Sequence, residues 1–154
     1  SGGSYLRAMK FAGDTSWMQD NLQQFMTMTR LSFELHKKHE LQKTQDMFKW
    51  VADMNQKGRE YQKNFLNYAL RLFREATLQS YHTDEMTKMS QPEKEFMDRF
   101  HKVINHANIL KIAGEFEKAV YAVERNGNGN LIFMDLCFLL NRELRRGHKA
   151  MTQK

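Results

Sequence analysis

The chain has 154 residues and a single cysteine, which allows one domain with its own core and excludes a disulfide framework or a cysteine-rich zinc site. Its formal net charge is +6, from 24 Lys and Arg against 18 Asp and Glu, so it is moderately basic. Without a membrane-length apolar run or a secretory signal, the sequence predicts a cytoplasmic protein with a reduced, buried Cys137.

One proline and few β-branched residues favour helix along nearly the whole chain, so we expect an all-α bundle of about six or seven helices. A short helix is expected over Ser4 to Ala12, ending at Gly13. The next begins near Ser16, where Ser16 and Gln19 have capping-box spacing. Its apolar face is Leu22, Phe25, Met26 and Phe33, with Thr29 between them, at intervals of three or four residues.

A third helix is predicted from Leu41 to Lys57, followed by Gly58 as the left-handed residue beyond its end. The fourth and longest is predicted from Arg59 to about Tyr81. The inward residues expected on these two helices are Met47, Trp50, Val51 and Met54, then Tyr61, Phe65, Tyr68, Ala69, Leu72, Phe73 and Ala76.

A strong helix start follows at SQPEKEF, where Ser90 can cap, Pro92 fits the first turn, and acidic side chains favour the positive helix end. That helix is expected to continue through Phe96, Phe100, Val103 and Ile104. Another follows Asn108, with apolar positions at Ile109, Ile112, Phe116, Val120 and Val123. The last, over Leu131 to Leu140, is apolar nearly all round, which predicts the central and most buried helix.

The stretch VERNGNGNLIFMDL resembles the calcium loop of an EF-hand, with Glu124 at loop position 1, Gly129 at position 6 and Asp135 at position 12. The carboxylates are too few, however, and Asp135 is one methylene shorter than the bidentate glutamate usual there. Asn and Gly also tolerate left-handed backbone, so Asn126, Gly127, Asn128 and Gly129 are typical of a sharp helix–helix turn. We therefore expect a structural turn and no metal.

Other chemistry is weakly represented. His36 and His39 have a spacing that can hold a metal, but no carboxylate completes a motif, so a solvated helix end is the better interpretation. We find no nucleophile motif and no phosphate-binding glycine loop, so we expect no catalytic residues, no cofactor and no enzymatic activity. The adjacent pairs Arg59–Glu60, Arg74–Glu75 and Arg142–Glu143 are interpreted as helix-surface salt bridges.

The C-terminal segment RELRRGHK leaves two interpretations open. Its cations, Arg142, Arg145, Arg146 and Lys149, could contact phosphates, as expected of a basic all-α nucleic-acid-binding domain. They could equally be a solvated helix end whose charges offset the helix dipole.

Two segments together resemble a known family. FKWVADMNQKGREYQKNFLNYALRLFRE, from Phe48 to Glu75, and FEKAVYAVERNGNGNLIFMDLCFLL, from Phe116 to Leu140, are similar to the C-terminal region of bacterial DNA polymerase III clamp-loader subunits of the delta-prime or delta kind. A third stretch, GGSYLRAM at residues 2–9, resembles the last helix of an AAA+ lid domain, but Leu6 stands where ATP-sensing versions carry arginine. The resemblance divides the chain into a lid-like end, residues 1–13, and a helical collar domain, residues 14–154.

The resemblance implies a non-catalytic role. In such loaders, helical C-terminal domains pack into a collar that holds the subunits together during DNA replication, while ATPase modules open the sliding clamp. The expected partners are other clamp-loader subunits of the DNA polymerase III holoenzyme, with DNA met only indirectly and neither membrane nor small-molecule substrate. Arg59, Glu60, Arg74 and Glu75 are candidate interface residues, because paired charges can select neighbours in a helical assembly; exposed pairs of little energetic value are the alternative.

Overall fold

The computed structural model describes residues 16–35, 41–80 and 89–152. Over these residues the chain forms only helices: α2 (Ser16–Glu34), α3 (Leu41–Gln56), α4 (Arg59–Ser80), α5 (Gln91–Phe100), the 3-10 turn η1 (His101–Val103), α6 (Ile109–Glu124) and α7 (Gly129–Thr152). The predicted all-α bundle is confirmed. The helix predicted over Ser4 to Ala12, the proposed lid-like end, and the histidine pair His36 and His39 lie outside the described residues.

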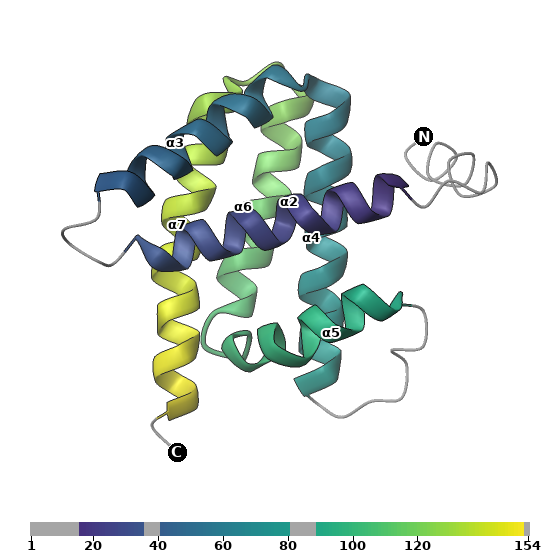
Figure 1. Ribbon diagram of the computed structural model, residues 1–154, viewed down its shortest axis with the longest axis vertical. Helices are drawn as coiled ribbons and strands as arrows, with labels where there is room; N and C mark the ends of the chain where they lie inside the picture. Colours follow the sequence, from purple (N-terminus) through teal and green to yellow (C-terminus); the bar gives the residue numbers. More distant parts are fainter. Residues whose placement is uncertain (1–15, 36–40, 81–88, 153–154) are drawn as a thin grey trace.

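Three helices form the body of the bundle (Figure 1). α4, α6 and α7 stand side by side, with α6 running antiparallel to both neighbours, while α2 crosses them and packs on α4 and α7. α3 lies across one end of the bundle against α7, and α5 lies near the opposite end. The α3–α4 and α6–α7 turns therefore meet at the same end of the molecule.

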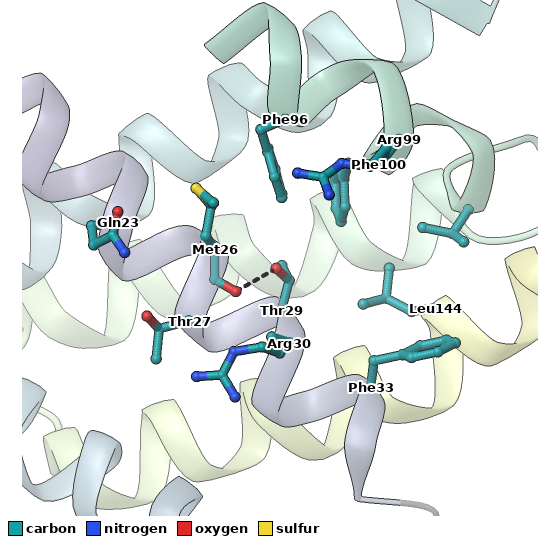
Figure 2. Close-up of a pocket in the computed structure, with 11 residues that line it drawn as sticks. Gln23, Met26, Thr27, Thr29, Arg30, Phe33, Phe96, Arg99, Phe100 and Leu144 are labelled. Carbon is teal, nitrogen blue, oxygen red and sulfur yellow. Dashed lines mark hydrogen bonds between the residues drawn. The ribbon is translucent and has the colours of Figure 1, made fainter. Parts of the chain in front are cut away.

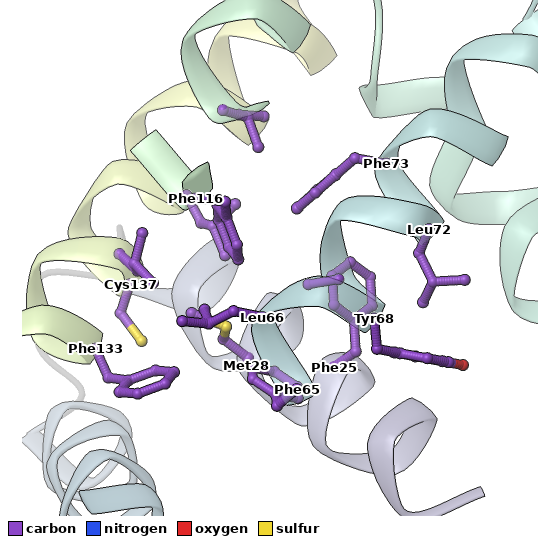
Figure 3. Close-up of a cluster of buried hydrophobic side chains, with 14 of the residues drawn as sticks. Phe25, Met28, Phe65, Leu66, Tyr68, Leu72, Phe73, Phe116, Phe133 and Cys137 are labelled. Atoms are coloured by element: carbon purple, nitrogen blue, oxygen red, sulfur yellow. The ribbon is translucent and has the colours of Figure 1, made fainter. Parts of the chain in front are cut away.

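Aromatic side chains fill the core where α2 crosses the body (Figure 3). Phe25, fully buried on α2, lies edge-on to Phe73 and Phe100, with ring centroids 5.2 and 5.4 Å apart. Phe73 in turn meets Phe116 of α6 at 5.0 Å. Such edge-to-face pairs add to the free energy that burial of the rings already supplies. A second group, at the α3 end, joins Trp50, Phe65 and Phe133.

The predicted inward faces are largely confirmed. All four positions predicted on α3 are buried, and so are the positions predicted on α4 except Tyr61, which packs at the edge of the core. Gly58 takes a left-handed φ of 90° after α3, as predicted. Ser90 caps α5 through a complete capping box with Glu93. In contrast to the prediction, α5 stops at Phe100; the chain tightens into η1, and Ile104 is extended, with φ −109° and ψ 117°.

The final helix differs most from the prediction. α7 starts at Gly129 and has 24 residues, so it, and not the 22-residue α4, is the longest helix described. Its expected burial on all sides is wrong: Leu131 is 60% exposed and Phe138 41% exposed. The apolar run is wider than the surface that α2, α3, α6 and η1 cover, so one stripe of the helix faces solvent.

Candidate interaction surfaces

The α6–α7 turn is built from the four residues predicted for it. Asn126 has φ 63°, a left-handed conformation that asparagine tolerates better than most residues. The Asn126 N–H donates to Val123 O, and the Gly127 N–H donates to Ala122 O at 2.8 Å. This is the Schellman pattern, with Asn126 in the usual glycine position. Asn128 then caps α7, its side chain accepting from the Leu131 N–H at 3.3 Å.

The residues that mimic a calcium loop have other roles. The Glu124 carboxylate pairs with Lys63 Nζ of α4 at 3.2 Å. The side chain at calcium-loop position 3, Asn126, accepts from Arg59. Asp135 lies exposed on the second turn of α7. The turn therefore serves to reverse the chain and to attach it to α4.

The α3–α4 turn and the start of α7 fit closely together. The Gln62 side chain donates to Met54 O and Asn55 O, at 3.0 and 3.1 Å, and so ties the first turns of α4 to the end of α3. Gly129 lies against this pair: a Cβ there would come within 2.3 Å of Asn55 Oδ1. Arg59 completes the contact by donating to Asn126 Oδ1 at 2.5 Å. These contacts join the α3–α4 turn to the α6–α7 turn, and we call this joined region the locked end of the bundle.

The four candidate interface charges on α4 do not form one cluster. Arg59 is used within the molecule, Glu60 and Arg74 are exposed, and Glu75 has a buried Oε2 without a hydrogen-bond partner. The interpretation of Arg59–Glu60, Arg74–Glu75 and Arg142–Glu143 as surface salt bridges is wrong, since none of them pairs within the described chain. Neighbouring residues on a helix point about 100° apart, so adjacent opposite charges do not face each other.

A buried carboxylate joins α4 to α5. Glu93 is fully buried, accepting from Tyr68 Oη and Arg71 Nη2, each at 2.6 Å, and from the Ser90 N–H at 2.9 Å. Burial first, then the hydrogen bond to Glu93, raises the pKa of Tyr68 well above its usual range, so the phenol stays a donor. Sequence reasoning assigned Glu93 only to the helix dipole; Tyr68 and Arg71, one turn apart on α4, were the available signal of a buried acceptor.

A seam of asparagines fixes α7 against η1. Asn108, buried, donates through Nδ2 to Val103 O and Glu143 O, both at 2.7 Å, and accepts from the Asn105 N–H. Asn105 Nδ2 donates to Gly147 O at 3.0 Å. The absence of a side chain at Gly147 allows this approach, because a Cβ there would lie 2.0 Å from Val103 O.

The cations predicted on α7 divide into two groups. Arg146 pairs with the buried Glu143 at 3.5 Å. Arg142, Arg145 and Lys149 are exposed and have no acidic partner among the described residues. These three extend along one side of the helix.

Large apolar side chains are exposed in pairs on three helices. Leu41 (71% exposed) and Phe48 are seven residues apart on α3, Leu131 and Phe138 are seven apart on α7, and Leu110 (83% exposed) and Tyr121 are eleven apart on α6. Both spacings return to nearly the same side of a helix. We call each pair an apolar line; its two side chains face solvent on one side of the helix, with exposed polar residues such as Gln45 of α3 and Glu117 of α6 between them.

A groove of about 780 Å³ lies where α2 meets α5, η1 and α7 (Figure 2). Met26, Phe33, Phe96 and Leu144 contribute apolar surface, and Arg99 lies at its edge. Among the described residues, the lining contains no carboxylate, histidine or cysteine.

Cys137 is buried, as predicted, and burial raises the pKa of its thiol to about 12. His148 lies edge-on to Phe33. In the described part of the chain no three His, Cys, Asp or Glu side chains come close enough to hold a metal ion. None of the helices there has the length and hydropathy needed to cross a bilayer.

Comparisons of the chain with protein-family models, with curated proteins and with solved structures found no match. The exposed apolar side chains and the exposed charges of the chain are therefore the structural basis for a proposal about its function.

Proposed function

We propose that this chain is a non-catalytic oligomerisation domain, of the kind that forms the collar of a bacterial DNA polymerase III clamp loader, and that it acts in the cytoplasm. Its partners are then the helical domains of neighbouring loader subunits. The proposal rests on the resemblance of Phe48–Glu75 and Phe116–Leu140 and on one structural observation: the apolar lines exposed on α3 and α6.

These lines suit a helical partner. Leu41 and Phe48 on α3, and Leu110 and Tyr121 on α6, present apolar surface at the repeat by which helices pack side by side. Covering a large apolar side chain contributes about 1.5–3 kcal/mol relative to leaving it exposed. Two such lines on different helices match a domain with a neighbour on each of two sides.

The segments of the resemblance also meet in space. Phe48–Glu75 covers most of α3 and α4, Phe116–Leu140 covers the end of α6 and the start of α7, and the two are joined through Arg59–Asn126 and Lys63–Glu124. In the proposed role this locked end keeps α3 and α6 in fixed relation, so that both apolar lines are preorganised for association. Glu60 and Arg74, exposed on α4, would select the neighbour.

Light scattering after size exclusion tests the proposal. The chain is mixed with the C-terminal helical domains of clamp-loader subunits from the same organism, and the mass of the mixture is compared with that of each component. A mixed complex of defined stoichiometry is expected, weakened at least tenfold by Leu110→Glu and unaffected by Gln19→Glu, an exposed position on α2. If neither single domains nor the assembled remaining subunits bind the chain at tens of micromolar, the proposal is wrong.

A further inference from the structure

One exposed side of α7 carries an aromatic ring and three cations along a single line. Taking 100° per residue, Phe138, Arg142, Arg145 and Lys149 fall within about 40° of a common direction. All four are exposed. At 1.5 Å per residue the line is about 16 Å long, and its order is one aromatic ring followed by three cations.

No acid among the described residues pairs with the cations of this line. Arg142, Arg145 and Lys149 have no acidic partner among the described residues, and Glu143, the only carboxylate between Phe138 and Lys149, is 3% exposed and paired with Arg146. Asp135 lies on the same side but one turn before Phe138. A cation that is already paired gains little from a phosphate, whereas an unpaired one releases the counterions of the phosphate it contacts.

Phe138 is difficult to explain by the fold alone. Every other apolar residue from Ile132 to Leu140 is buried or packed against the core, whereas Phe138 is 41% exposed. An aromatic ring beside a row of cations is the arrangement that binds an unpaired base by stacking while the cations follow the backbone.

We propose that Phe138, Arg142, Arg145 and Lys149 form a binding track for single-stranded nucleic acid. The base of one nucleotide stacks on Phe138, and the phosphates that follow it contact the three cations. A single strand is preferred over a duplex because stacking on the Phe138 ring needs an unpaired base, and the bases of a duplex are already paired and stacked on one another. The track uses none of the α3 and α6 residues of the proposed subunit interface.

Fluorescence anisotropy with a labelled oligothymidylate tests the track, across a range of salt concentrations. Each phosphate contact on a single strand contributes about −0.7 to the slope of log affinity against log salt. The triple variant Arg142→Gln, Arg145→Gln and Lys149→Gln should therefore have a slope shallower by about 2. If the plots of log affinity against log salt for wild type and variant cross near 1 M, the variant should bind about 100-fold more weakly at 0.1 M salt. The control replaces Lys94, Lys102 and Lys118 by Gln, which removes three positive charges from exposed positions on other helices. It has the same net charge as the α7 variant and should retain the wild-type slope.

Phe138→Leu separates stacking from charge. It keeps an apolar side chain and should weaken binding about tenfold without changing the salt slope, since stacking on an aromatic ring contributes independently of phosphate contacts. The track is refuted if the control triple variant loses as much slope as the α7 variant. It is also refuted if the chain binds duplex of equal length as tightly as single strand, or if wild type shows no binding at 0.05 M salt. Circular dichroism of each variant establishes that the fold is retained.

Discussion

Replacing Gly147 by alanine should destabilise the protein, although alanine is the better helix former. Gly147 lies inside α7, where alanine normally stabilises by about 1 kcal/mol. The added methyl would, however, lie 2.0 Å from Val103 O and 2.3 Å from Asn108 Nδ2. Ordinary contact at 3.4 Å requires η1 to retreat from α7 by about 1.4 Å.

That movement opens the asparagine seam. Asn108 would lose or lengthen its 2.7 Å hydrogen bonds to Val103 O and Glu143 O, and Asn105 its 3.0 Å bond to Gly147 O. Overpacking costs about 1–3 kcal/mol, and each hydrogen bond contributes about 0.5–1.5 kcal/mol. After the helix-propensity gain, we expect the free energy of unfolding to fall by about 3 kcal/mol, and the Tm by about 6–12 °C.

Gly114 provides the matched control. It lies inside α6, and a Cβ there would meet nothing within 4 Å, so Gly114→Ala should raise the free energy of unfolding by about 0.5–1 kcal/mol. Urea unfolding followed by far-ultraviolet circular dichroism measures both variants, with an unchanged m-value as the check that the same surface unfolds. The reasoning is refuted if Gly147→Ala is as stable as wild type, or if both substitutions shift stability in the same direction.

Three other results are expected. Glu93→Ala should lower the free energy of unfolding by about 3 kcal/mol in urea titrations, because it leaves Tyr68 and Arg71 without their acceptor, whereas Glu95→Ala should stay within about 0.5 kcal/mol; equal losses would contradict the buried role. Asn126→Val should cost about 1–2 kcal/mol by the same assay, since a β-branched residue resists φ 63°, and a neutral outcome would argue against the left-handed turn. The Cys137 thiol, with its folded pKa raised to about 12, should favour folding fully below its unfolded pKa of about 8.5 and progressively less up to pH 12. The stability advantage of wild type over Cys137→Ala should therefore shrink by up to about 1.4 kcal/mol per pH unit above about 8.5, and a constant difference would refute this.

Much of the helical architecture follows from local signals in the sequence. The apolar repeat of α3 and α4 predicts which side of each is buried, because a helix of this composition must cover one stripe to be stable. Gly58 and the cap at Ser90 mark helix ends correctly, since caps depend on residues adjacent in the chain. The NGNGN turn belongs with these, as its left-handed residue and its cap are both asparagines.

Sequence patterns fail where residues far apart in the chain determine the outcome. Glu93 looked like a helix-dipole residue because its partners, Tyr68 and Arg71, lie on another helix. Adjacent opposite charges suggested salt bridges, but the carboxylate beside Arg142 turns inward and pairs with Arg146. The apolar run Leu131–Leu140 predicted a helix buried on all sides. That prediction failed because a hydrophobic pattern does not show how many neighbouring helices will cover it.

The sequence by itself determined that this protein is helical, where most of its helices begin and end, and which stripe of each is apolar. Those properties depend on residues within one or two turns of one another. Only the tertiary structure decided that Gly147 permits a close seam, that Glu93 is a buried junction, and that Phe138 faces solvent beside unpaired cations. Each of these depends on which helices pack together, because burial and pairing are properties of the assembled surface and not of the chain.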